Sequence, residues 1–151
     1  MKSLLYTNEF PPHIYGGAGV HVDYLTRELA KLINVDVRCF GDQDITQPTL
    51  TARGYQVDKS GYTCPEKLQS VFACLQQGLD FNADGNDADV VHCHTWYTHM
   101  AGILTKLNYG IPLVVTAHSL EPLRPWKREQ LGGGYDCSSW VEKTAIEMAD
   151  A

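Results

Sequence analysis

The sequence has few of the features that mark membrane, secreted or nucleic-acid-binding proteins. No apolar run approaches the length of a membrane span, and no N-terminal segment joins a basic start to an apolar core and a small-residue cleavage site. Its 12 lysines and arginines face 18 aspartates and glutamates, so the net charge is −6. This balance argues against nucleic acid or an anionic membrane as the main partner.

Cysteine is present, but its pattern favours neither disulfides nor a metal site. The five cysteines are odd in number and widely spaced, and no C-x-x-C occurs. The phosphate-loop sequence Gly-Lys-Ser/Thr and the zinc sequence H-E-x-x-H are missing as well. We therefore expect reduced thiols, a cytoplasmic location, and neither a metal nor a cofactor.

The chain has enough length and apolar content for one domain with a core, at 151 residues and 44% apolar. Apolar periodicity predicts strands over 3–7, 35–40, 88–92 and 113–116, and helices over 20–32, 65–79, 96–109 and 138–148. On the first helix, one apolar face is expected to comprise Val22, Leu25, Leu29, Leu32 and Ile33. Residues 41–62 are predicted to be irregular, with a short strand at most over 54–58, and 81–87 to form a loop.

Strands that alternate with helices indicate an α/β fold, a doubly wound parallel sheet of the Rossmann-like kind. Right-handed crossovers place all strand-to-helix loops at one edge, where such sheets bind ligands. Three loops meet this rule, over 8–19, 93–96 and 118–134, and they hold nearly all of the unusual residues.

The first of these loops ends in three glycines, Gly16, Gly17 and Gly19, just before a helix. Glycine lets a backbone approach a ligand closely, and a helix N-terminus favours an anion. The spacing is not that of the dinucleotide fingerprint G-x-G-x-x-G. A phosphate or hydroxyl-rich ligand is our preferred interpretation, and an ordinary helix-entry turn is the alternative.

The second loop follows a run of histidines. His92 and His94 would share one face of a strand, which invites a metal site, but further ligands at suitable spacing are missing. We favour one histidine in the core and one lining the cleft, with His94 nearer the cleft.

The third loop adds His118 and a basic cluster of Arg124, Lys127 and Arg128. His118 ends an apolar strand, where it can donate to a sugar hydroxyl or stabilise charge, although a structural role is also common there. The cluster predicts a phosphate site or, equally, a solvated face. Glu9 and Glu121 are the carboxylates expected in the cleft.

Three segments together resemble a known family, the retaining GT-B glycosyltransferases of family 4. They are Tyr-Gly-Gly-Ala-Gly-Val-His at 15–21, Val-Val-His-Cys-His-Thr-Trp-Tyr-Thr at 90–98, and the run from Thr-Ala-His-Ser to Gly-Gly-Gly-Tyr at 116–135. The last run is similar to bacterial glycogen synthases of the actinobacterial type, a group that includes maltose-1-phosphate synthases.

The resemblance implies two doubly wound domains, with the active site between them. It implies transfer of glucose from a nucleotide sugar, commonly ADP-glucose, to an α-glucan or to glucose 1-phosphate, with retention and without a metal, in glycogen synthesis. Residues 1–151 would be the N-terminal, acceptor-side domain of this GT-B fold. We expect the chain to be a fragment without its C-terminal sugar-donor domain; oligomerisation stays open.

By position, the resemblance implies that Gly16 and Gly17 offer N–H groups to the sugar donor's diphosphate and that His118 contacts the transferred glucose. The acceptor side would comprise Glu9, His94, Trp96, Tyr97, Arg124 and Lys127. Starch-synthase-type enzymes have lysine at the place of Tyr15 and aspartate at the place of Thr95, so this chain fits the family 4 branch. Two alternatives are a family 4 transferase with a sucrose-type or lipid-linked acceptor, and a non-catalytic carbohydrate-binding module.

Overall fold

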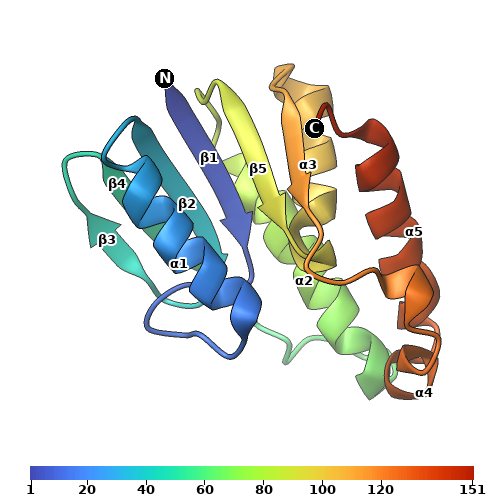
Figure 1. Ribbon diagram of the computed structural model, residues 1–151. Helices are drawn as coiled ribbons and strands as arrows, with labels where there is room; N and C mark the ends of the chain where they lie inside the picture. Colours follow the sequence, from blue (N-terminus) through green and yellow to red (C-terminus); the bar gives the residue numbers. More distant parts are fainter.

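The computed structural model describes the backbone of residues 1–151 and every side chain but that of Leu131. Its centre is a six-stranded sheet in the order β3-β4-β2-β1-β5-β6 (Figure 1). The strands are β1 (Lys2–Thr7), β2 (Asn34–Phe40), β3 (Asp44–Thr46), β4 (Leu50–Tyr55), β5 (Val90–His94) and β6 (Leu113–Thr116). The helices are α1 (Gly17–Leu29), α2 (Glu66–Ala83), α3 (Trp96–Tyr109), η1 (Glu121–Leu123), α4 (Lys127–Leu131) and α5 (Gly134–Met148).

All neighbouring strands are parallel except β3, which pairs antiparallel with β4 at one edge. The strand β1 lies at the centre, between β2 and β5, and Leu5 pairs with Val37 on one side and His92 on the other. Helix α1 covers one face, while α2 and α3 cover the other (Figure 1). The predicted doubly wound α/β fold is thus confirmed, and the carboxyl ends of the parallel strands share the lower edge in Figure 1.

Alternate residues of β1 pack into two hydrophobic cores, one on each face of the sheet. Leu5 packs with Val22 of α1 and Val37 of β2, whereas Leu4 and Tyr6 pack on the other face with the α2 and α3 side. Complete burial of such side chains contributes about 1.5–3 kcal/mol each, so both faces hold the sheet firmly. No helix in the described part of the chain has both the length and the apolar character needed to cross a bilayer.

Helix α1 is displaced from its predicted bounds at both ends. It begins at Gly17 rather than at residue 20, because the glycines join the first turn, and it ends at Leu29. Leu32 was expected on the apolar face, but it lies beyond the helix and is 81% exposed. The apolar spacing continued past the point at which the backbone leaves the helix.

The prediction of irregular structure for 41–62 was wrong for β3 and β4. In β4, Leu50 and Ala52 are buried while Thr51 between them is exposed, which is the alternation of a strand covered on one face. The strand lies earlier than the proposed 54–58. Its polar outward residues hid this alternation from a search for apolar runs.

Three further boundaries differ from the predictions. Helix α2 continues to Ala83, so Phe81 belongs to the helix and not to a loop, and its side chain is completely buried. Strand β5 is shifted by two residues, to Val90–His94, and α5 begins at Gly134 instead of at a serine cap. Burial against the sheet decided these boundaries, rather than local turn signals.

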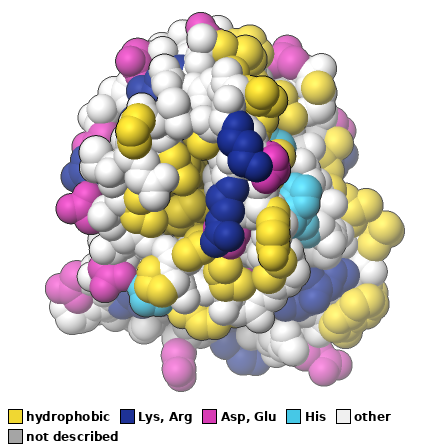
Figure 2. Space-filling model, turned by 60° about the vertical axis from the view of Figure 1, so that its left-hand side comes forward, with side chains coloured by type: hydrophobic (Ala, Val, Ile, Leu, Met, Phe, Trp, Pro, Cys, Tyr) yellow, Lys and Arg dark blue, Asp and Glu magenta, His cyan; other side chains and the backbone are white. Residues whose placement is uncertain are grey.

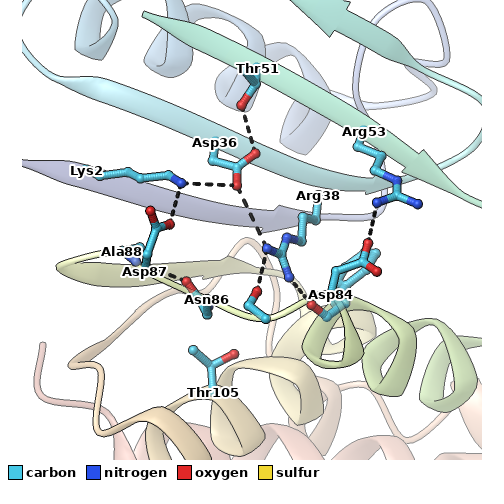
Figure 3. Close-up of polar contacts among 12 residues, drawn as sticks. Lys2, Asp36, Arg38, Thr51, Arg53, Asp84, Asn86, Asp87, Ala88 and Thr105 are labelled. Atoms are coloured by element: carbon cyan, nitrogen blue, oxygen red, sulfur yellow. Dashed lines mark hydrogen bonds and ion pairs between the residues drawn. The ribbon is translucent and has the colours of Figure 1, made fainter.

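A buried arginine ties the end of α2 to the sheet (Figure 3). Arg38 of β2 donates from Nη1 to the carbonyl of Phe81 and from Nη2 to that of Gly85, at 2.7 Å for the latter. Asp36 lies 3.9 Å from the same guanidinium and 3.9 Å from Lys2 Nζ. Since carbonyls at a helix C-terminus lack intrahelical partners, Arg38 supplies the donors that α2 needs.

Candidate functional site

The loops that follow β1, β5 and β6 meet at the carboxyl edge of the sheet, as the fold rule requires. A hydrogen bond of 3.1 Å from Thr95 Oγ1 to Asn8 Oδ1 joins the first two loops. Thr95 itself has φ of 66°, a left-handed conformation that a β-branched residue rarely adopts. Such strain gathers at functional sites, and here it turns the chain from β5 directly into α3.

Glu9 folds back onto the N-terminus of α1. Its Oε2 accepts the backbone N–H of Tyr15 and of Gly16, both at 2.8 Å. Gly16, the N-cap, has no side chain to do this, so a distant carboxylate takes the anion position that the helix dipole favours. A Cβ on Gly19 would come within 2.7 Å of Glu9 Oε2, so this arrangement needs glycine there.

The two glycines assigned to the sugar donor differ in their surroundings. The N–H of Gly16 is engaged by Glu9. Around Gly17, a Cβ would meet nothing within 4 Å, and the first N–H groups of a helix have no intrahelical acceptor. Gly17 therefore presents open backbone at the cleft, whereas Gly16 becomes available only where Glu9 moves.

Four histidines form a layer beside this helix end. His94 Nδ1 lies 3.1 Å from His118 Nε2, and the rings of His92 and His94 have centroids 4.2 Å apart. His21 of α1 packs edge-on against His118, with a centroid distance of 5.2 Å. The layer thus combines residues of β5, α1 and the segment after β6.

The members of this layer differ in exposure and in pKa. His118 is exposed at the edge, while His94, expected nearer the cleft, is completely buried beneath it. Burial, helped by the neighbouring His92, lowers the pKa of His94 to about 2, and burial lowers that of His92 to about 4. Burial and then His21 also lower the pKa of His118. A direct acceptor contact by His94 would require its ring to become accessible, so that role stays a prediction.

Among the described residues, no group of three or more histidines, cysteines or acidic residues is arranged to hold a metal ion. Two contacts engage ring nitrogens of the layer: His94 Nδ1 with His118 Nε2, and His92 Nε2, which lies 2.7 Å from Thr116 Oγ1. All five cysteines are free thiols.

Trp96 and Tyr97 open α3 directly below Thr95. Their rings stack at 4.5 Å, and Trp96 is only 6% exposed because it packs against Val71 and Cys74. Tyr97 is half-buried, and burial, followed by the charges of Cys74 and Glu121, raises the pKa of its hydroxyl. Trp96 thus supports the ring of Tyr97, and the predicted acceptor contact of Tyr97 stays a prediction.

The segment after His118 holds an internal ion pair. Glu121 is 2% exposed, and Arg124 Nη1 lies 3.2 Å from both Glu121 Oε1 and Ser119 Oγ. Glu121 also donates its N–H to Glu142 Oε2, and burial raises the pKa of Glu142. Glu121 is therefore not a free cleft carboxylate, and Arg124 is already partly neutralised.

The other two basic residues of this segment diverge. Arg128 pairs with Asp136 at 2.5 Å and turns away into a surface ion pair. Lys127 is half-buried at the start of α4. Its predicted role of holding a phosphorylated acceptor stays a prediction. The structure thus brings Glu9 near both Tyr97 and His118, and Arg124 near Tyr97, and leaves Arg128 outside this group.

His21 is the site residue that the sequence reasoning missed. It lies one helical turn after Gly17, on the polar side of an amphipathic helix, and its ring packs against both His118 and His94. The position one turn after a glycine-rich helix start was the available signal, since such a side chain lies over the helix N-terminus.

Charges on the surface are mostly compensated locally. On the face drawn in Figure 2, basic side chains lie beside acidic ones and do not form a broad patch of one sign. Arg27 pairs with Asp23 at 2.7 Å and Lys31 with Glu28 at 2.6 Å. The face drawn in Figure 2 thus shows no broad basic patch of the kind that binds phosphate backbones.

Sequence comparison finds a known protein that is similar over the whole of this chain. The chain is 49% identical over 155 aligned residues to the alpha-maltose-1-phosphate synthase of Mycolicibacterium smegmatis, a match that covers 100% of this chain and 37% of that protein. The chain thus spans little more than a third of the length of the relative it matches.

Two solved structures share the fold. Sucrose-phosphate synthase from Thermosynechococcus elongatus has a TM-score of 0.72 at 19% identity, covering 99% of this chain and 41% of that one. The catalytic domain of starch synthase IV from Arabidopsis thaliana, bound to ADP and acarbose, has a TM-score of 0.59 at 14% identity, covering 79% and 34%. Residues 15–151 match the glycosyltransferase family 4 profile, and the chain belongs to that family.

Proposed function

We propose that this chain forms the acceptor-side domain of a glucosyltransferase that makes α-glucan or maltose 1-phosphate. The observation that carries the proposal is the position of exposed His118, which lies at the carboxyl edge among Glu9, His21 and the start of α1. The identity of 49% to an alpha-maltose-1-phosphate synthase supports the substrate class. Family membership alone would leave the acceptor undefined.

The proposed sugar donor is ADP-glucose, and transfer retains the anomeric configuration. The bond between glucosyl C1 and the diphosphate oxygen breaks, and C1 bonds to the acceptor's hydroxyl oxygen. The hydroxyl proton leaves with the departing diphosphate. Catalysis then depends on positioning and on charge stabilisation, because the chain needs no covalent intermediate for these steps.

The N-terminus of α1 is the proposed contact for the diphosphate. Gly17 offers an open N–H and the positive end of the helix dipole. Glu9 holds the same helix end through Tyr15 and Gly16 until an anion of higher charge replaces it. Glu9 can then turn toward the acceptor, which reconciles its two expected roles.

On the acceptor side, Tyr97 offers an aromatic face, which suits a sugar ring, and a hydroxyl group. Lys127 and Arg124 would hold the phosphate of glucose 1-phosphate, and Arg124 would share its guanidinium with Glu121. We propose a cytoplasmic location, consistent with five free cysteines, and a second domain that supplies the remaining contacts to the nucleotide.

A chimaera tests this proposal directly. This chain would replace the corresponding part of the Mycolicibacterium smegmatis relative, and release of ADP from ADP-glucose would be measured with glucose 1-phosphate or glycogen as acceptor. We expect turnover with at least one acceptor. For His118→Ala we also expect a lower kcat, equivalent to an activation free energy higher by about 2.7–4 kcal/mol. This is the scale for removing one hydrogen-bond donor to the transition state.

The rival functions give different results in the same assay. A non-catalytic carbohydrate-binding module would bind glucan but show no turnover in the chimaera, although the parent enzyme is active. A family 4 transferase with another acceptor would release ADP by glucosyl transfer only when that acceptor is supplied. A chimaera in which His118→Ala keeps full kcat would refute the role given to His118.

A further inference from the structure

A hydrogen bond between two histidine side chains joins the carboxyl end of β5 to the segment just after β6. His94, the last residue of β5, and His118, just beyond β6, approach through Nδ1 and Nε2 at 3.1 Å. One of these two nitrogens must carry the proton, because a neutral imidazole has one N–H and one lone pair. Which ring donates decides which nitrogen of His118 carries an N–H.

The second nitrogen of His94 settles the direction of this bond. His94 has no exposed surface, and among the described residues its Nε2 has no hydrogen-bond partner. A proton on Nε2 would leave a buried N–H without an acceptor, which is rare in proteins and unfavourable. A proton on Nδ1 leaves only a lone pair unpaired and provides the donor for His118.

We propose that His94 is a positioning residue: its Nδ1–H donates to His118 Nε2, fixes the ring of His118, and restricts the neutral ring to the tautomer protonated at Nδ1. The inference rests on the proposed function only in treating His118 as a residue that contacts the transferred sugar. It assigns His118 Nδ1 as the ring nitrogen able to donate a hydrogen bond. It also moves His94 from the acceptor contacts to the support of His118.

The neighbours of His94 hold its ring in place. His92 lies against it with a centroid distance of 4.2 Å and is itself anchored to Thr116 Oγ1 at 2.7 Å. Burial lowers the pKa of His94 to about 2, so the ring is neutral near neutral pH. It therefore acts as a fixed donor and does not take up a second proton.

The charged and titratable groups that face His118 come from three elements. They are His21 of α1, Glu9 of the loop before α1, and both His92 and His94 of β5. Burial and His21 lower the pKa of His118, and Glu9 raises it. Protonation of His118 at Nε2 would remove the acceptor that His94 uses, so the contact itself also favours neutral His118.

Ring-nitrogen NMR on this chain, labelled with ¹⁵N-histidine, tests the inference without an activity assay. The His118 signals are identified by their loss in His118→Asn. At about pH 8, where exposed histidine is neutral, we expect His118 to be protonated at Nδ1 and bare at Nε2. In His94→Phe, which keeps an aromatic ring but no donor, we expect a shift to the Nε2–H tautomer and a rise in the pKa of His118.

Two variants separate positioning from general damage to the fold. His94→Asn places an amide N–H near the position of Nδ1 and should restore the wild-type tautomer. His99→Phe makes the same change at a second buried histidine. Neither ring nitrogen of His99 has a hydrogen-bond partner in the described structure, so this variant should leave His118 unchanged.

Wild-type His118 protonated at Nε2, or the same tautomer in His94→Phe as in wild type, would overturn the inference. The expected tautomers together with full kcat in the His118→Ala chimaera would instead refute the proposed function and leave the role of His94 standing.

Discussion

Glu9 Oε2 accepts the backbone N–H of Gly16 at 2.8 Å, so a carboxylate of the protein occupies the anion position at the start of α1. If this position also receives a diphosphate, the two anions compete. Glu9→Gln removes the resident charge but keeps an oxygen acceptor for the same N–H groups. We expect pyrophosphate to bind this variant more tightly than the wild type in calorimetry at low salt, since like charge no longer opposes it. Unchanged or weaker binding would show that anions do not use this helix end.

The glycines around Glu9 give a matched pair of substitutions. In Gly19→Ala, the new Cβ would lie 2.7 Å from Glu9 Oε2 and 2.8 Å from Glu9 Cβ, so the loop must shift. Overpacking of this kind typically costs about 1–3 kcal/mol. Gly17→Ala meets nothing within 4 Å and should change the free energy of unfolding little. Urea denaturation of both variants checks the contrast; equal effects would contradict the tight contact at Gly19.

The parts of this molecule that could be predicted from sequence are those with strong local periodicity. The fold class, α3 and β6 followed from apolar spacing and from the run Leu113–Thr116. Strand β4 was missed because its outward residues are polar and only Leu50 and Ala52 signal burial. Propensity is a weak guide where one face of a strand is solvated.

At the site, sequence could place residues on the correct edge but not assign their partners. The loops carrying Glu9 and His118 were predicted to meet, and they do. Glu121 and Arg124 are only three residues apart, but the burial of Glu121 that encloses their ion pair depends on tertiary packing, as does the complete burial of His94. Neither burial has a local pattern, so each needed the structure.

Arg38 should be the most sensitive charged residue for stability. Arg38→Met would leave the carbonyls of Phe81 and Gly85 without their side-chain donor and would remove one of the cations beside Asp36 (Figure 3). Removing one partner of a buried charge network costs about 3–5 kcal/mol. As a control, Arg53→Met breaks an exposed pair with Asp84 of 2.5 Å, for which about 0.2–1 kcal/mol is expected. Chemical unfolding of the two variants should differ accordingly, and similar losses would contradict the role of Arg38.

Buried histidines should make the protein sensitive to acid. Burial lowers the pKa of His99 from 6.5 to about 4. Between these values the unfolded chain binds the proton and the folded chain does not. Stability is therefore complete above about pH 6.5 and falls as the pH decreases, by at most about 1.4 kcal/mol per pH unit for one such group. His99→Phe should reduce the pH dependence of the urea midpoint by the contribution of one bound proton. An unaltered pH dependence would show that a different group binds the proton on unfolding.

The basic residues after His118 distinguish between the two proposed acceptors. Lys127 is the cleaner probe, because Arg124→Ala would also strand the buried carboxylate of Glu121, which Arg124 Nη1 contacts at 3.2 Å. If the acceptor is glucose 1-phosphate, Lys127→Ala in the chimaera should raise KM for it several-fold, because only that acceptor presents an anion to a lysine. The KM for glycogen should be unaffected.

Arg124→Ala combined with Glu121→Gln removes the guanidinium without leaving a buried charge, and should also raise the KM for glucose 1-phosphate. Equal changes in KM for both acceptors would show that these residues contact the sugar donor or support folding. No change for either acceptor would show that they lie on a solvated face.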